Sequence, residues 1–153
     1  MTKEIPISNG MISLVDDENF EEISKYEWHI NYKYAQTFFY IDDKRICKKL
    51  HHLILDVPDG MEIDHIDHDG LNNQKSNLRV CTHQQNTMNK SKNKLCSSKY
   101  KGVDSLCNKW RARIMFNGKS VYLGRFKNER DAAKAYNKAA IELHGKYSNL
   151  NEI

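Results

Sequence analysis

The 153-residue sequence contains few residues that break or cross-link a chain: 2 prolines, 7 glycines and 4 cysteines. With 39% hydrophobic residues, this composition excludes collagen-like and low-complexity chains. The longest apolar run is Phe38–Ile41, whereas a membrane-spanning helix needs about 20 apolar residues. We therefore expect a soluble, folded protein of one ordinary domain or two small ones.

The amino terminus lacks the apolar core and the cleavage site of a secretory signal, so we expect a reducing, cytoplasmic environment. The cysteines include no Cys-x-x-Cys pair, which disfavours structural zinc. Although Cys47 and Cys81 each lie near a histidine, we expect both to be buried, reduced thiols.

The net charge of +4 hides an uneven distribution. Residues 1–50 carry 7 basic and 9 acidic side chains, residues 51–90 carry 3 and 6, and residues 91–153 carry 14 and 5. A basic C-terminal part is typical of a module that contacts a polyanion. Residues 91–98 are polar and basic without an apolar period, so they predict a linker between domains 1–90 and 99–153.

Hydrophobic periodicity predicts an α+β protein. The first part begins with a β-rich region, residues 1–47: a hairpin at Asn9-Gly10, a short helix over 16–24 and a strand pair within 28–41. It continues with a helix over 48–55, strands over 61–66 and 78–81 joined by a polar loop, and a helix that begins near Thr82. The second part predicts strands over 101–104, 110–116 and 120–123, then a helix between Asn128 and Gly145.

Four side chains of the first part suit phosphodiester chemistry. Asp64 and His65 stand together at a predicted strand end, Asn77 begins the return strand, and Asn86 lies in the following helix. Carboxylate and amide oxygens suit a hard cation such as Mg²⁺, and histidine suits proton transfer near neutral pH. From the residues alone, an alternative stays open: Asp64 and His65 form a polar pair, and the asparagines serve turns and caps.

This part resembles the HNH endonuclease family, in particular its phage and intron homing branch. The resemblance rests on Leu50-His-His-Leu-Ile54, Gly60-Met-Glu-Ile-Asp-His-Ile66, Asn77-Leu-Arg79 and Thr82 to Asn86. It implies a ββα-metal (His-Me finger) core over about 48–90. In that core Asp64 and Asn86 hold a divalent cation, Mg²⁺ or else Mn²⁺, His65 is the general base, and Asn77 braces the loop that orients His65.

Two features depart from the family's usual pattern: His52 stands where an arginine is usual, and His68 adds a histidine to the loop. The roles of His51, His52, His68 and His83 stay open, including whether His68 or His83 is a further ligand. Arg79 and the linker lysines are candidates for phosphate contacts.

Residues 99–151 resemble the Apetala-type, or ethylene-response-factor-like, DNA-binding domain. The resemblance rests on Tyr100-Lys-Gly-Val103, Trp110-Arg-Ala-Arg-Ile114, Tyr122-Leu-Gly-Arg-Phe126, Asp131-Ala-Ala-Lys-Ala-Tyr136, Ala139-Ala140, Gly145 and Asn149-Leu-Asn151. It implies a three-stranded antiparallel sheet, packed on one helix, that enters the major groove.

Strand alternation predicts which side chains of this sheet face DNA. If Trp110, Ala112, Ile114 and Phe116 pack on the helix, Arg111, Arg113 and Met115 point outward. By resemblance, Lys101, Ser120 and Tyr122 also occupy contact positions. Asp104, Met115 and Ser120 stand where plant members commonly carry arginines, so base preference does not transfer.

The sequence therefore predicts a metal-dependent, homing-type endonuclease that acts on double-stranded DNA, at a site chosen by its C-terminal domain. We expect a monomer or weak dimer, without a membrane partner, encoded by a phage or mobile element and located in the bacterial cytoplasm. The alternative is a sequence-specific DNA-binding regulator with a catalytically silent nuclease-like half; a nucleic-acid chaperone is a more remote one.

Overall fold

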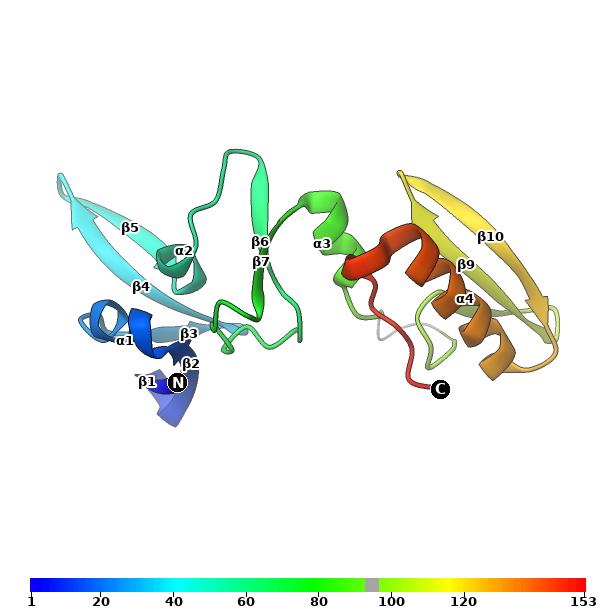
Figure 1. The fold of residues 1–153 in the computed structure, drawn as a ribbon, viewed down its shortest axis with the longest axis horizontal. Coiled ribbons are helices and arrows are strands. Elements are labelled where there is room, and N and C mark those ends of the chain that lie inside the picture. Colours follow the sequence, from blue (N-terminus) through cyan, green and yellow to red (C-terminus); the bar gives the residue numbers. More distant parts are fainter. Residues whose placement is uncertain (93–96) are drawn as a thin grey trace. The chain divides into compact units, whose positions relative to one another are not determined.

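The computed structural model of the protein describes residues 1–92 and 97–153 and divides into two compact units, residues 1–82 and 83–153 (Figure 1). Both mix small antiparallel sheets with short helices. The first unit contains β1 (Thr2–Ile7), η1 (Ser8–Gly10), β2 (Met11–Asp16), α1 (Asp17–Ile23), β3 (His29–Asn31), β4 (Tyr34–Ile41), β5 (Lys44–Lys49), α2 (His51–Ile54), β6 (Met61–His65) and β7 (Leu78–Thr82). The second contains α3 (His83–Asn89), β8 (Val103–Leu106), β9 (Lys109–Phe116), β10 (Lys119–Phe126), α4 (Glu129–His144) and η2 (Gly145–Tyr147).

Three sheets form the first unit: the β1–β2 hairpin, the β3–β4–β5 sheet and the β6–β7 hairpin. The predicted turn at Asn9-Gly10 is confirmed, with positive φ at both residues (68° and 72°). One core of buried apolar side chains serves all three sheets, and it includes Ile5, Val15, Ile23, Trp28, Leu50, Ile63 and Leu78. Burial of these side chains fixes which face of each hairpin stays exposed.

The loop between β6 and β7 is attached to strand β2. The backbone N–H of Leu14 donates to the carbonyl of Leu71 (2.8 Å), and that of Asn73 donates to the carbonyl of Leu14 (2.8 Å). The same loop touches the β3–β4 turn, because a Cβ on Gly70 would clash with the carbonyl oxygen of Lys33. These contacts bring segments far apart in sequence to one side of the β6–β7 hairpin.

The predicted helix over 48–55 is wrong in its first part. The antiparallel pairing of β5 with β4 continues to Lys49, opposite Gln36, and α2 spans only His51–Ile54. One helical turn suffices to bury Leu50 and Ile54, so the apolar spacing that predicted a longer helix is satisfied without one. Cys81 is buried as expected, but Cys47 is exposed because it lies on the outer side of β5.

In the second unit, α4 packs against the β8–β9–β10 sheet, and Figure 1 shows it running alongside β9 and β10. The predicted alternation along β9 is confirmed: Ala112 and Ile114 are buried under the helix, and Arg113 and Met115 are exposed. Gly145, with φ of 53°, ends the helix as expected. Among the described residues, no helix combines the length and apolar character needed to cross a bilayer.

The two units meet in sequence at residue 82, eight residues before the predicted domain boundary at 90. Helix α3 belongs to the second unit, because the Lys101 ammonium donates to the carbonyl of Met88 (2.6 Å) and the Asn149 amide donates to that of Asn89 (3.0 Å). Residues 93–96 of the predicted linker lie outside the described residues. Ser98, at its end, is buried and donates to Glu129 on α4, so it is part of the second unit.

Candidate active site

The β6–β7 hairpin positions the two residues that the sequence placed at the centre of the chemistry. Asp64 lies opposite Arg79 in the ladder, and its Oδ2 accepts hydrogen bonds from Arg79 Nε (2.9 Å) and Nη2 (2.6 Å). The side chain of Asp64 is 7% exposed. The Arg79 guanidinium therefore balances the charge of this buried carboxylate and orients it.

His65 is the last residue of β6, as the sequence predicted for this pair, and its side chain is buried. Alternation along the strand directs it to the face opposite that of Asp64. There its ring lies against those of Tyr34 (5.7 Å between centroids) and His51 (5.0 Å, nearly perpendicular). The chain leaves the strand at Ile66, whose N–H donates to the carbonyl of Asn77 (2.9 Å).

One ring nitrogen of His65 is bound by a residue that the sequence did not single out. His65 Nε2 lies 3.1 Å from Asn73 Oδ1, and Asn73 is completely buried. The Asn73 Nδ2 donates to Ser13 Oγ (2.8 Å) and to the carbonyl of Gly70 (3.3 Å), and Ser13 Oγ donates to the carbonyl of Leu71 (2.8 Å). Since a carbonyl only accepts, the amide must turn its nitrogen toward Gly70 and its oxygen toward His65.

This hydrogen-bond line sets the tautomer of His65. Because Asn73 Oδ1 can only accept, the ring must carry its proton on Nε2, and the lone pair of the neutral imidazole lies on Nδ1. Burial lowers the pKa of His65 below its ordinary value, opposed by the Asn73 hydrogen bond and by the charges of Asp67 and Asp64. The neutral, proton-accepting form is therefore favoured.

Asn77 closes the loop that follows His65. Its Oδ1 accepts from the backbone N–H of Asp67 (3.0 Å), and its Nδ2 donates to Asp67 Oδ1 (2.8 Å) and to the carbonyl of Asn72 (2.8 Å). Asp67 Oδ2 also accepts from Asn72 Nδ2 (2.7 Å), and hydrogen bonds from Asn72, Asp69 and Asn77 lower the pKa of Asp67 against the opposing effect of burial. These contacts are of the kind that bracing the loop requires, while the catalytic role of Asn77 stays a prediction.

The remaining histidines differ in environment. His51 on α2 is buried against Tyr34 (5.3 Å) and His65, and its Nδ1 has no hydrogen-bond partner within the part of the chain that the structure describes. Desolvation, with the charges of His65, His52 and Lys49, lowers the pKa of His51 to about 3. His52 and His83 are exposed, and His68 is partly exposed with φ of 68°. Their roles stay open.

The first unit offers one oriented carboxylate to a divalent cation. Within residues 1–92 and 97–153, no group of three or more His, Cys, Asp or Glu side chains is arranged to hold a metal. Arg79 orients the carboxylate of Asp64, and a carboxylate oxygen is a donor that Mg²⁺ accepts. Asn86 lies on α3 of the second unit. The pairing of Asp64 with Asn86 stays a prediction.

The second unit presents the sheet face that the sequence assigned to DNA. The β9–β10 register places Ser120 opposite Met115 and Tyr122 opposite Arg113, so the four side chains share one face. The register also places Arg125 opposite Arg111, which adds an exposed arginine that the sequence analysis missed. A bulge between Tyr122 and Gly124 shifts the register, so alternation from the strand start gave no signal for Arg125.

Two charged residues on or near this face are already engaged within the unit. Asp104 on β8 accepts from Arg111 Nε (2.9 Å) and Nη2 (2.6 Å) and lies 3.3 Å from Arg113 Nη2; these guanidinium groups lower the pKa of Asp104. Lys101 donates to the carbonyl of Met88, and burial lowers its pKa to about 8. The face is therefore less positive than its arginine count suggests, and Lys101 serves the packing of α3.

Known proteins resemble both parts of this chain. The HNH endonuclease family profile matches residues 56–88. An uncharacterized HNH endonuclease, L560, of Acanthamoeba polyphaga mimivirus is 33% identical over 147 residues, which cover 94% of this chain and 76% of that protein.

APETALA2-like protein 2 of Oryza sativa subsp. japonica is 41% identical over 58 residues, and AP2-like ethylene-responsive transcription factor TOE2 of Arabidopsis thaliana is 39% identical over 59. These stretches are 36% and 37% of this chain and 13% and 12% of the plant proteins. No solved structure matches.

The β6–β7 hairpin, with its oriented carboxylate and tautomer-defined histidine, and the likeness along nearly the whole chain define a nuclease. The chain belongs to the HNH endonuclease family. HNH endonucleases act on DNA and generally use a divalent metal ion.

The pKa of His51 predicts how stability depends on pH. The folded protein keeps His51 neutral, whereas in the unfolded chain this histidine titrates near pH 6.5. The contribution of His51 to the free energy of unfolding is therefore complete above pH 6.5 and is lost as the pH falls toward 3. Between pH 7 and pH 5 the loss is about 2 kcal/mol. His51→Phe should remove this part of the pH dependence, which is measured as the free energy of unfolding by denaturant at each pH. His29→Phe, at an exposed position, is the control, and an unchanged pH dependence in His51→Phe would contradict the assignment.

Proposed function

We propose that this protein is a Mg²⁺-dependent, homing-type DNA endonuclease in which His65 is the general base. The observation that carries the proposal is the buried chain of hydrogen bonds from His65 through Asn73 to Ser13. This chain makes Nδ1 of His65 the proton-accepting nitrogen. A base with one defined tautomer needs no rearrangement before it accepts a proton from water. The silent-regulator alternative gains no specific support from the structure.

The chain's own residues supply orientation and proton transfer. His65 Nδ1 takes a proton from the attacking water while Asn73 holds the opposite side of the ring, so that the imidazolium remains hydrogen-bonded as it forms. Asn77 holds the loop after His65 through Asp67. Asp64, oriented by Arg79, would hold the cation, with Asn86 as its predicted partner ligand. A bound Mg²⁺ or Mn²⁺ would supply charge stabilisation for phosphodiester hydrolysis.

The second unit is proposed to be an Apetala-type DNA-binding domain that selects the site on double-stranded DNA. The likeness to plant APETALA2-like proteins supports this assignment, as does a three-stranded sheet whose outer face carries Arg113, Met115, Ser120 and Tyr122. A β-sheet fits the major groove, where every base pair presents a distinct pattern of donors and acceptors. The Asp104 carboxylate holds Arg111 by one edge of its guanidinium, so Arg111 approaches DNA in a fixed orientation.

Substitution of the base tests the chemistry. His65→Ala should reduce cleavage of a plasmid that carries the target site at least about 100-fold, because proton abstraction loses its acceptor. The reaction is run with Mg²⁺ and, separately, with chelator, and nicked and linear products are separated. The affinity of His65→Ala for DNA should stay close to that of the wild type. Equal cleavage by the wild type and by His65→Ala, or cleavage by the wild type in excess chelator, would refute the assignment.

Substitution of Asn73 tests the tautomer. Asn73→Ala should lower kcat about 10–100-fold and change the pH profile of cleavage, with little change in KM, because the His65 ring loses the acceptor that fixes its proton. Ser76→Ala, in the same loop and exposed, is the control. Circular dichroism and thermal melting establish that both variants fold. A folded Asn73→Ala variant with the wild-type kcat and pH profile would show that Asn73 has only a structural role.

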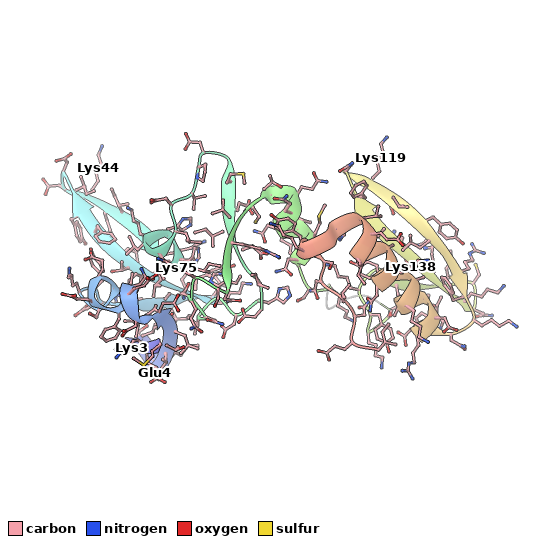
Figure 2. The ribbon with its side chains drawn as sticks, in the orientation of Figure 1. Lys3, Glu4, Lys44, Lys75, Lys119 and Lys138 are labelled. Atoms are coloured by element: carbon pink, nitrogen blue, oxygen red, sulfur yellow. The ribbon has the colours of Figure 1, made fainter. Side chains whose placement is uncertain are left out.

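Substitution of Arg113 tests the second unit. Arg113→Ala should weaken binding to the target site by about 1–3 kcal/mol or relax its sequence preference, with little effect on single-turnover cleavage at saturation. Lys138→Ala removes one positive charge from α4, away from the sheet, and serves as the charge-matched control (Figure 2). Equal affinity and equal site preference in both variants would contradict the docking face.

A further inference from the structure

The cations of the first unit are distributed unevenly between its elements. Residues 1–82 contain 9 lysines and arginines and 15 aspartates and glutamates. Four of the cations form ion pairs with carboxylates: Lys3, Lys25, Lys75 and Arg79. Five have no carboxylate within ion-pair distance among residues 1–92 and 97–153: Lys33, Lys44, Arg45, Lys48 and Lys49. All five lie on the β3–β4–β5 sheet or in its β3–β4 turn.

The strand register divides these cations between the two faces of the sheet. Opposite partners in an antiparallel pair share a face, so Arg45 joins Tyr40, Lys49 joins Gln36, and Cys47 joins Phe38. The other face carries Ala35 and Thr37, both buried in the core of the unit. We call the outward side the aromatic–basic face; it consists of His29, Asn31, Tyr34, Gln36, Phe38, Tyr40, Arg45, Cys47 and Lys49.

Aromatic rings hold the cations of this face in place. The Arg45 guanidinium lies 3.6 Å from the centre of the Phe38 ring, and the ammonium groups of Lys49 and Lys33 lie 4.8 Å and 5.3 Å from that of Tyr34. A guanidinium stacked on a ring keeps its in-plane N–H donors directed outward. Arg45 is therefore positioned to bind an oxyanion with little further loss of side-chain entropy.

The aromatic–basic face continues to the general base. The ring of Tyr34, over which Lys49 and Lys33 lie, also contacts the rings of His65 and His51. Gly70, in the loop after His65, lies against the Lys33 carbonyl and the Tyr34 ring. The electrostatic effect of Lys33 at His65, and of Lys49 at His51, lowers the pKa of each histidine, which agrees with this proximity.

We propose that the aromatic–basic face binds the phosphate backbone of duplex DNA beside the bond that His65 acts on, with Arg45 and Lys49 as phosphate ligands. This inference rests on the proposed function. Lys49 follows Arg45 by four positions of extended strand, a span of about 13 Å. That distance equals the axial rise of about four base pairs, so the face follows the DNA flank next to the cut.

Charge complementarity identifies the occupant as a polyanion. The first unit has six more carboxylates than cations, and the unpaired cations concentrate on this one sheet, so the rest of its surface repels phosphate. Asp42 and Asp43 occupy the β4–β5 turn, and neither lies within ion-pair distance of Arg45. A DNA strand on this face should therefore run from Arg45 toward Tyr34 and His65.

The β5 strand offers a charge-matched test. The double variant Arg45→Ala/Lys49→Ala removes two cations from the aromatic–basic face, whereas Lys44→Ala/Lys48→Ala removes two from the other side of the same strand (Lys44 is labelled in Figure 2). Affinity of the full-length protein for a duplex of about 30 base pairs, with chelator present, is measured against salt concentration. The first variant should lower the slope of log K against log salt by about two, and the control by much less.

Cleavage provides the second readout. With Mg²⁺, Arg45→Ala/Lys49→Ala should raise the DNA concentration needed for half-maximal cleavage at least about 10-fold relative to the control variant. Equal salt slopes and equal cleavage curves for the two variants would overturn the proposal while leaving the nuclease assignment intact. Absence of cleavage by the wild type on a genomic library would instead refute the proposed function, and the salt slopes would still decide whether the face binds DNA.

A natural cysteine reports on the same face. Cys47 is exposed between Arg45 and Lys49, and its thiol donates to Gln36 Oε1 (3.3 Å). A duplex with a thiol-reactive tether on a phosphate within about four base pairs of the cut should form an adduct that peptide mapping assigns to Cys47. Cys47→Ser should abolish this adduct. Adducts at Cys107 alone would show that DNA avoids the aromatic–basic face.

Discussion

The hydrogen bonds of the buried Asn73 amide hold the candidate site together. They join Ser13 on β2, Gly70 in the β6–β7 loop and His65 on β6, three positions that only the folded chain brings together. An unpaired buried amide costs about 1–3 kcal/mol, so each of these groups constrains the others to the positions observed. The loop therefore cannot move independently of the first hairpin, and the imidazole cannot exchange tautomers without breaking a buried hydrogen bond.

The proposed catalytic residues of the first unit lie on two sides of one hairpin, and their surroundings differ. The Arg79 guanidinium binds and orients the Asp64 carboxylate, whereas burial lowers the pKa of His65 beside Tyr34 and His51. In the proposed mechanism, one residue would bind a cation and its neighbour would accept a proton. Since neighbouring strand residues face opposite ways, this separation of environments follows directly from β geometry.

The aromatic–basic face is the surface of the first unit that we propose binds the substrate. An acidic unit can approach DNA only along a surface where its cations are not neutralised, and the β3–β4–β5 sheet is that surface among the described residues. Stacking of Arg45 on Phe38 and of Lys49 on Tyr34 holds these cations on the face, and Tyr34 also contacts the His65 ring. In the second unit, by contrast, Asp104 partly neutralises Arg111 and Arg113 of the sheet.

The sequence by itself determined the local features: the Asn9-Gly10 turn, the burial of alternate residues along β9, the end of α4 at Gly145 and the place of Asp64 and His65 at the end of a strand. These depend on φ preferences and on periodicity, which nearby residues specify. Only the tertiary structure decided that Lys44–Lys49 forms a strand, that Cys47 is exposed and that Asn73 binds His65. Each of these depends on a contact with another strand or loop, and chain spacing alone carries no information about that contact.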